Sequence, residues 1–292
     1  GLAYAAQHFK CEATIFMPEA TPLTKVSGVK SYGANVVLVG ENFDEAYATA
    51  TKSALDNDKE FIHPFADDAV IAGQGTIALE ILEKIEDIEH IIVPIGGGGL
   101  ISGIAIAAKA INPNIKITGV VASGARGMKD SFEARMPIDS ASVKTIADGI
   151  AVRDVTPKLL DIILEYVDQI VEVTDNETAN AILFLLEKHK LMVEGAGAVA
   201  TAAIMHGKVD IENSKVCAIV SGGNIDVTML SLIIEKGLVK SNRKMNLIVT
   251  LMDKPGALMF LTEVFTKSSA NIVQIDYDRK SVKLEFGEAH VT

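Results

Sequence analysis

Four consecutive glycines, Gly96–Gly99, constrain the fold of this chain more than any other feature of its sequence. The segment from Ile91 to Leu100 reads IIVPIGGGGL, an apolar strand followed by glycines and then by an apolar helix predicted to end near Ala110. Glycine turns through positive φ without a Cβ clash, so several N–H groups can converge on one cluster of oxygens. The helix would direct its unpaired N–H groups and positive dipole end to the same place. The run predicts a phosphate-binding turn; the alternative is a flexible turn, which is costly in conformational entropy.

The spacing around the glycines does not fit the common nucleotide-binding loops. A mononucleotide loop needs Gly-Lys followed by Ser or Thr, and this chain has Leu100 and Ile101 instead. The dinucleotide pattern Gly-x-Gly-x-x-Gly is approached by Gly98 and Gly103 only because of the glycine run. A phosphate held by backbone groups alone suits a cofactor monoester better than a triphosphate.

Composition limits the classes of partner and site. The 292 residues are enough for about two domains, and the net charge of −11 argues against nucleic acid or an anionic membrane as a partner. Cys11 and Cys217 have neither metal-binding nor disulfide spacing, which favours a reducing, cytoplasmic location. No apolar run reaches the length of about 18 residues needed for a membrane span.

Alternating apolar strands and helices indicate an α/β fold with a parallel sheet. The expected strands are 13–17, 35–39, 91–95, 117–121, 170–173 and 216–220, and the expected helices are 24–32, 44–57, 100–110, 158–166 and one from a capping box at Thr174 and Glu177 to Lys190. Gly73–Thr76 is read as a turn before another helix, and 123–155 as a long irregular stretch. After a basic segment, 245–251 is predicted as a strand, 257–268 as a helix, 271–277 as a strand and a further strand starts near Ser281, which is β-α-β-β order.

Six motifs in this order resemble the fold type II enzymes that use pyridoxal 5'-phosphate, specifically the threonine dehydratase (threonine ammonia-lyase) group and the related serine racemases. The motifs are His63-Pro64-Phe65, Ala72–Thr76, Gly96–Leu100, Ala147-Asp148-Gly149, Glu194–Ala198 and Ser221–Asn224. The tail resembles an ACT domain, whose first loop matches Asp253-x-Pro255-Gly256. The resemblance implies an α/β, two-lobed parallel-sheet architecture of the tryptophan synthase β type, followed by a partial ferredoxin-like domain.

The domain boundaries follow from this resemblance. Residues 1–62 would be the remainder of the small cofactor lobe, 63–235 the large lobe, 236–244 a linker and 245–292 a partial ACT-like regulatory domain. The chain opens in what reads as mid-helix and stops in what reads as mid-strand, so it is expected to be an N-terminally incomplete fragment.

The resemblance also implies roles for individual residues. Gly96, Gly97, Gly98, Gly99 and Leu100 would hold the cofactor phosphate through backbone N–H groups. Ser221 would hydrogen-bond the pyridine nitrogen, and the alternative is a turn serine that caps the strand end. Gly149 would line the cofactor face, or serve only as a turn glycine. Glu194 would be a carboxylate close to the cofactor, or a carboxylate stabilised by a helix N-terminus, and His63 is expected to be a structural turn residue.

One departure from the family pattern concerns catalysis. Enzymes of this type bind the cofactor through a Schiff-base lysine in a Ser-Phe-Lys-x-Arg-Gly context, which is absent here, so the catalytic residues are unknown. The nearest match, Ser131–Arg135, carries Glu133 in place of the lysine and lies downstream of the glycines. Val121-Ala122-Ser123 stands where relatives often carry an acidic metal ligand, so no metal site is predicted.

The resemblance implies β-elimination on L-threonine, and on L-serine, with release of a 2-oxoacid and ammonia. Two alternatives remain: a racemase or β-replacement enzyme of the same fold, and a non-catalytic amino-acid-sensing fragment. The tail would bind an amino-acid effector through Asp253, Pro255 and Gly256, and a homodimer or homotetramer is expected. The sequence leaves open whether the role is threonine catabolism or isoleucine biosynthesis.

Overall fold

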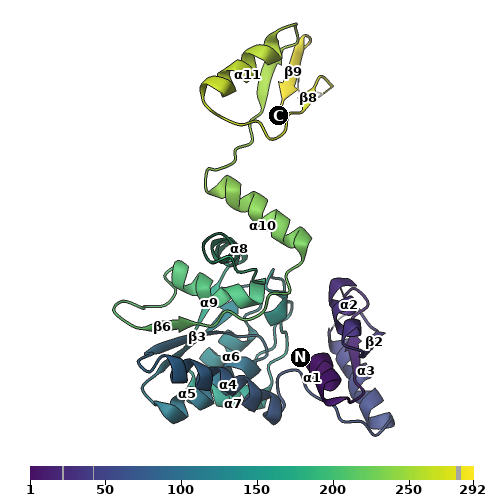
Figure 1. Ribbon diagram of the computed structural model, residues 1–292, viewed down its shortest axis with the longest axis vertical. Helices are drawn as coiled ribbons and strands as arrows, with labels where there is room; N and C mark the ends of the chain where they lie inside the picture. Colours follow the sequence, from purple (N-terminus) through teal and green to yellow (C-terminus); the bar gives the residue numbers. More distant parts are fainter. Residues whose placement is uncertain (22, 42, 281–283) are drawn as a thin grey trace. The chain divides into compact units, whose positions relative to one another are not determined.

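The chain folds into two compact units, Gly1–Asp226 and Val227–Thr292. The structure is a computed structural model, and it describes residues 1–292 except 22, 42 and 281–283 (Figure 1). In the part of the chain that it describes, every helix is too short or too polar to cross a bilayer.

The first unit begins with a small lobe, defined as residues 1–62. Its two strands, β1 (Thr14–Met17) and β2 (Asn35–Leu38), pair in parallel with Thr14 opposite Asn35. The helices of the small lobe are α1 (Leu2–Phe9), α2 (Leu23–Ser31) and α3 (Phe43–Asp56). These elements confirm the predicted β-α-β-α order to within two residues at each end.

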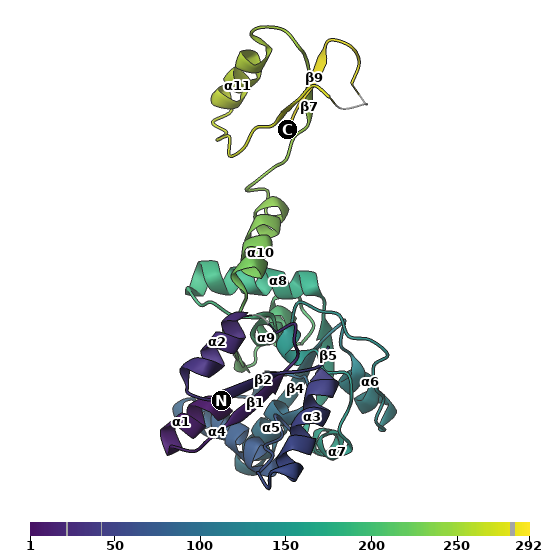
Figure 2. The same ribbon diagram turned by 90° about the vertical axis from the view of Figure 1, so that its right-hand side faces the viewer.

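The large lobe, residues 63–226, is built on a parallel sheet with strand order β5-β4-β3-β6. Its strands are β3 (His90–Pro94), β4 (Lys116–Ala122), β5 (Gln169–Val173) and β6 (Val216–Ala218). Its α-helices are α4 (Asp68–Lys84), α5 (Gly99–Ile111), α6 (Gly127–Ala134), α7 (Pro157–Tyr166), α8 (Asp175–Phe184) and α9 (Gly195–Met205), and short 3₁₀ and π turns lie at Asp148–Ile150 and Leu185–His189. Helix α9 covers one face of the sheet, and α4, α5 and α7 cover the other (Figures 1 and 2).

Strand β3 forms the centre of the core because it is paired on both sides and covered on both faces. Ile91, Ile92 and Val93 have no exposed surface. Ile91 and Val93 belong to one buried cluster with Ile101 and Ile104 of α5. A strand buried on both faces reads as a continuous apolar run, which is how 91–95 appears in the sequence. The predicted capping box at the start of α8 is confirmed: Thr174 and Glu177 hold each other's backbone N–H groups.

The expected turn at Gly73–Thr76 is wrong, because these residues lie inside α4. The helix begins earlier, where the Asp67 side chain accepts hydrogen bonds from the N–H groups of Ala69 and Val70. Gly75 lies at a helix crossing, where α4 meets Gly103 of α5, instead of in a turn. A Cβ on Gly103 of α5 would lie 2.2 Å from the Ile71 carbonyl oxygen, and one on Gly75 would lie 2.9 Å from the Gly103 carbonyl oxygen.

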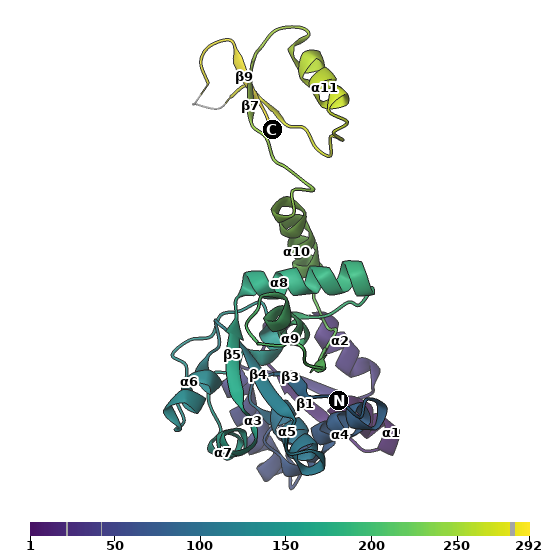
Figure 3. The same cartoon turned by 90° about the vertical axis from the view of Figure 1, so that its left-hand side faces the viewer.

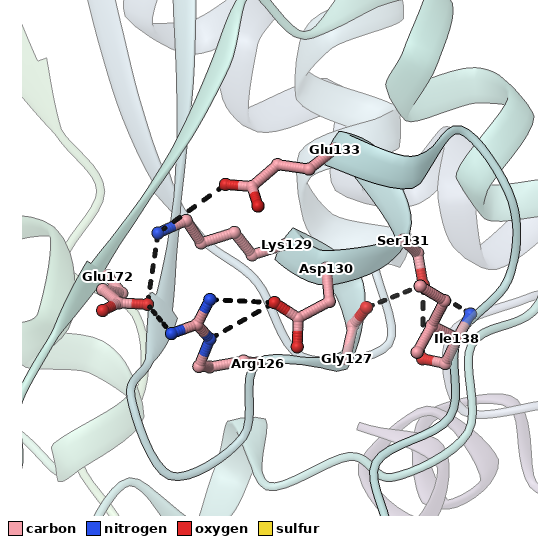
Figure 4. A network of polar contacts seen from close by, with 8 residues as sticks. All are labelled: Arg126, Gly127, Lys129, Asp130, Ser131, Glu133, Ile138 and Glu172. Atoms are coloured by element: carbon pink, nitrogen blue, oxygen red, sulfur yellow. Dashed lines mark hydrogen bonds and ion pairs between the residues drawn. The ribbon is translucent and has the colours of Figure 1, made fainter.

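The expectation of an irregular 123–155 stretch is also wrong, because helix α6 forms within it. Charged side chains hold this helix to β5 (Figure 4). Arg126 contacts both Asp130, at 2.9 Å, and Glu172, at 3.2 Å, while Lys129 contacts Glu172 at 3.2 Å and Glu133 at 3.8 Å. The segment with the superficial lysine-motif match therefore forms a surface helix, and Glu133 pairs within it.

The buried hydroxyl of Ser131 fixes the loop that follows α6. Ser131 Oγ donates to the Gly127 carbonyl oxygen at 2.7 Å and accepts from the Ile138 N–H at 2.8 Å (Figure 4). The periodicity of the sequence does not reveal polar contacts between residues that are several positions apart. The helix and its loop are therefore predicted as irregular from sequence.

The second unit contains helix α10 (Val227–Lys240) and a small α+β fold. Its later elements are β7 (Val249–Met252), α11 (Ala257–Lys267), β8 (Tyr277–Asp278) and β9 (Glu288–Val291), with antiparallel strand order β7-β9-β8 (Figures 1 and 3). The predicted β-α-β-β order is confirmed, although the strand expected at 271–277 is reduced to β8. The start of the strand expected near Ser281 lies outside the described residues.

The boundary predicted at residue 235 falls inside α10, and part of the predicted 236–244 linker is helical. The basic residues near Lys240 gave that segment the composition of a linker. The apolar residues upstream nevertheless recur at helical spacing, and Ile233 among them is buried.

Replacing Gly103 by alanine should destabilise the first unit by about 1–3 kcal/mol, because the new methyl group meets backbone where two helices cross. The matched control is Gly73→Ala in α4, where a Cβ meets nothing within 4 Å; this change should stabilise the protein by about 0.5–1 kcal/mol. Urea unfolding followed by circular dichroism measures both. Equal stability of the two variants would contradict the close crossing.

The buried side chain of His90 should make the free energy of unfolding depend on pH. His90 is buried, its Nε2 lies 2.7 Å from Thr118 Oγ1, and burial together with nearby Lys116 lowers its pKa below the ordinary 6.5. The unfolded chain therefore binds a proton near pH 6.5 that the folded chain does not bind, and stability should fall as pH drops through this range. His90→Gln should reduce the slope of unfolding free energy against pH between 7.5 and 5.5. An unchanged slope would show that His90 does not contribute.

Candidate functional site

A cavity of about 960 Å³ lies in the first unit at the carboxyl ends of the strands. The order β5-β4-β3-β6 places β4 and β5 on one side of β3 and β6 on the other, so the topology switches between β3 and β6. Open α/β sheets bind ligands at such a switch point. The cavity is lined by the glycine run after β3, by 148–154, by Glu194 and Ala196, by Ser221 and Gly222 after β6, and by Phe43 and Tyr47 from the small lobe.

The glycine run forms an open cradle of backbone donors. In the described chain, the N–H groups of Gly96, Gly97 and Gly98 donate no hydrogen bond to another residue. The N–H groups of Gly99 and Leu100 belong to the first turn of α5, where no intrahelical acceptor exists. Gly98 has φ of +99°, a conformation that favours glycine, and it places the start of the helix against the cavity.

Phe65 explains why the cradle requires glycine. A Cβ on Gly97 would lie 2.4 Å from the Phe65 ring, and one on Gly99 would lie 2.3 Å from the Phe65 carbonyl oxygen. Phe65 is itself held by His63, whose Nδ1 accepts from the N–H groups of Phe65 and Ala66 at 3.2 and 2.9 Å. Burial lowers the pKa of His63, so the ring stays neutral and can accept. These contacts support the interpretation of His63 as a structural turn residue.

The segment after β6 approaches α9 backbone to backbone. A Cβ on Gly197 would lie 1.8 Å from the Ser221 carbonyl oxygen, so only glycine allows this loop to lie where it does. The loop turns at Gly222, which has φ of +83°. The Gly222 carbonyl oxygen accepts a hydrogen bond from the Glu194 N–H at 3.2 Å. Ser221 is thereby held at the cavity wall next to the cradle strand.

Glu194 is the N-cap residue of α9, but its side chain does not cap that helix. Its Oε2 accepts from the Asn224 N–H at 3.1 Å, so it holds the loop that carries Ser221. Burial and, less strongly, Asp148 raise the pKa of Glu194, while Lys25 and the Asn224 N–H oppose that rise. Of the two interpretations made from sequence, a carboxylate at the cavity agrees with this geometry better than a simple helix-end carboxylate.

The structure brings the predicted cofactor-binding residues together. Gly96–Leu100, Gly149, Ser221 and Glu194 all line the cavity. A Cβ on Gly149 would lie 3.0 Å from the Ala196 Cβ, so Gly149 also sits at a close contact. Sequence reasoning missed Phe65 as the partner of the cradle and missed Phe43 and Tyr47, whose i, i+4 spacing on α3 was the available signal.

The predicted effector loop lies in the second unit. Asp253 Oδ1 accepts from the Tyr277 hydroxyl and pairs with Arg279, both at 3.0 Å, and Arg279 lies over the Tyr277 ring. Gly256, with φ of +89°, is the N-cap of α11, and Pro255 precedes it in the turn. Asp253 therefore joins its loop to the segment of β8 in this structure.

No group of three or more His, Cys, Asp or Glu side chains is arranged to hold a metal ion within the described ranges.

Fold and site together define an α/β protein with a cavity for a phosphorylated ligand. The chain matches the family described as "Pyridoxal-phosphate dependent enzyme" over residues 1–222. It is 44% identical to an L-threonine ammonia-lyase of Thermotoga maritima over all of this chain and 72% of that protein. This chain belongs to the family of pyridoxal-phosphate dependent enzymes, and the predicted fold type II architecture is confirmed.

Two solved structures have a fold similar to that of this chain. The processed form of threonine deaminase isoform 2 from Solanum lycopersicum superimposes with a TM-score of 0.75 at 37% identity, covering 80% of this chain and 65% of that one. Maize serine racemase gives the same TM-score at 35% identity, covering 82% and 74%.

The residues present fit the phosphate of this cofactor. The unbonded N–H groups of Gly96–Gly98, the first turn of α5 and the absence of Cβ atoms leave room and donors for a dianion at one place.

Gly99→Ala should weaken the binding of pyridoxal phosphate to the full-length protein at least about tenfold, because the methyl group meets the backbone of Phe65, which cannot rotate away. Titration followed by cofactor absorbance measures this affinity. Gly28→Ala in α2, where a Cβ meets nothing within 4 Å, is the matched control and should bind as the wild type does. Unchanged affinity in Gly99→Ala would remove the cradle from the cofactor site.

Proposed function

We propose that the full-length protein containing this chain is an ammonia-lyase that uses pyridoxal phosphate and converts L-threonine, and also L-serine, to a 2-oxoacid and ammonia by β-elimination. The cradle and Ser221 at one switch point carry this proposal, and the 44% identity to an L-threonine ammonia-lyase supports it. The amino acid loses its α-proton and β-hydroxyl group, and water then replaces the nitrogen, so the net products are one 2-oxoacid and one ammonia.

The backbone of Gly96–Leu100 would bind the cofactor phosphate. Because these donors are fixed by helix α5 and by the Phe65 contacts, they need no rearrangement when the dianion arrives. When bound, pyridoxal phosphate supplies an electron sink for the carbon that loses its proton. Its phosphate group, held by the N–H groups of Gly96–Leu100, would supply acid–base chemistry close to the departing hydroxyl group.

Ser221 would hydrogen-bond the pyridine nitrogen. A hydroxyl group, unlike a carboxylate, leaves that nitrogen largely without a proton, and the electron sink is then weaker. Ser221 would in this way favour loss of the β-hydroxyl group over side reactions. Glu194 would position Ser221 through the Asn224 N–H, and Gly149 would form part of the wall against the cofactor face.

Removal of the α-proton requires a base. No lysine lines the cavity among the described residues, and His63 Nδ1 is engaged with backbone N–H groups. Activity is therefore a property proposed for the full-length protein, in which the Schiff-base lysine would act as the base.

We also propose a regulatory role for the second unit, an oligomeric state and a cellular location. The second unit would act as an ACT-like module that binds an amino acid at the loop of Asp253, Pro255 and Gly256, in a cytoplasmic homodimer or homotetramer. Its β-α-β-β order and the helix N-terminus at Gly256 support this reading. The small lobe, large lobe and regulatory module would be the three functional parts.

Racemisation is a second candidate, because maize serine racemase superimposes on this chain with a TM-score of 0.75. Both reactions begin with loss of the α-proton, so the cradle and Ser221 do not distinguish them.

Incubation of the full-length protein with L-threonine or L-serine tests the function. We expect one 2-oxoacid per ammonia from each substrate, measured by the 2-oxoacid hydrazone and by ammonia release. Chiral chromatography of the remaining amino acid is the control for racemisation. Formation of the D-amino acid without a 2-oxoacid would favour a racemase, and calorimetric binding without any product would favour an amino-acid sensor.

A further inference from the structure

An ion pair joins the small lobe to the wall of the cavity. Lys25 lies on α2 and Asp148 lies in the 3₁₀ turn Asp148–Ile150, which are 123 positions apart in sequence. Lys25 Nζ contacts Asp148 Oδ2 at 2.7 Å, and the Lys25 side chain is 32% exposed. Asp148 lines the cavity and precedes Gly149.

The small and large lobes are joined by a segment without regular secondary structure. Residues 57–66 contain no helix or strand of regular type, and Asp58 has φ of +51°. The small lobe contributes Phe43 and Tyr47 to the cavity wall. Both lobes therefore supply walls of the cavity, and a change in their separation would change access to it.

Lys25 also balances charge at this wall. Burial first and then the Asp148 carboxylate raise the pKa of Glu194, and the Lys25 ammonium group opposes this rise. Glu194 in turn holds Asn224 and the loop that carries Ser221. When the lobes lie so that Lys25 contacts Asp148, the Lys25 charge therefore favours the charged form of Glu194, which supports the Ser221 loop.

We propose that Lys25 is a positioning residue for the reaction: its ion pair with Asp148 holds the small lobe closed over the cavity when an amino-acid substrate is bound. This inference rests on the proposed function for its kinetic consequences. Lys25 does not touch the reacting atoms; it raises the population of the closed form, and apparent substrate affinity scales with that population.

The kinetic test compares Lys25→Met with Lys25→Arg in the full-length protein. Partly exposed ion pairs of this kind change a population only modestly, so KM for L-threonine should rise about 1.5- to 5-fold in Lys25→Met, while kcat changes less than about twofold. Lys25→Arg keeps the charge and should restore most of the KM. Lys30→Met, an exposed residue on the same helix, is the matched control and should behave as the wild type.

Two further experiments swap the charges of Lys25 and Asp148 and measure hydrogen exchange in the absence of substrate. Lys25→Asp alone should raise KM further, and adding Asp148→Lys should recover part of the loss. Hydrogen exchange with cofactor bound should become faster in α2 and in 148–150 of Lys25→Met than in the wild type.

Unchanged KM and unchanged exchange in Lys25→Met would overturn the proposal, as would a loss confined to kcat. If the wild type forms no 2-oxoacid, the proposed function fails, while the exchange measurement still decides whether Lys25 holds the lobes together.

Discussion

The site depends on the pairing of β3 between β4 and β6. This strand is fully buried, and the chain after it emerges at the carboxyl end of the sheet, where the strand order reverses between β3 and β6. The glycine run follows β3 and Ser221 follows β6, so parallel pairing alone brings both to one end of the sheet. The remaining wall residues come from elements packed around this edge, which makes the strand order the first requirement for the cavity.

Close approaches of backbone to backbone then fix the details. Gly103 lies against Ile71, Gly99 against Phe65, and Gly197 against Ser221, and each contact excludes a Cβ. Such contacts place N–H and carbonyl groups with less freedom than flexible side chains would allow. The cost is a low tolerance for substitution, because the atom that a new methyl group would meet belongs to the main chain in each case.

Much of this arrangement was predictable from sequence. Apolar segments bounded by glycine, proline or polar residues predict the strands, and the glycine run predicts the cradle from sequence alone. The sequence of Gly73–Thr76 predicts a turn because glycine pairs are more common in turns than at helix crossings, and only the partner helix distinguishes the two. Helix α6 and Phe65 depend on contacts between residues far apart in sequence, such as Arg126 with Glu172, which no local pattern contains.

Binding of the cofactor phosphate by the backbone N–H groups of Gly96–Leu100 can be tested by a crystal structure of the full-length protein with pyridoxal phosphate. We expect phosphate oxygens within about 2.7–3.2 Å of several of these nitrogen atoms, with Ser221 Oγ at hydrogen-bond distance from the pyridine nitrogen. A phosphate bound elsewhere in the cavity, or held mainly by side chains, would show that the glycine run is not the phosphate site.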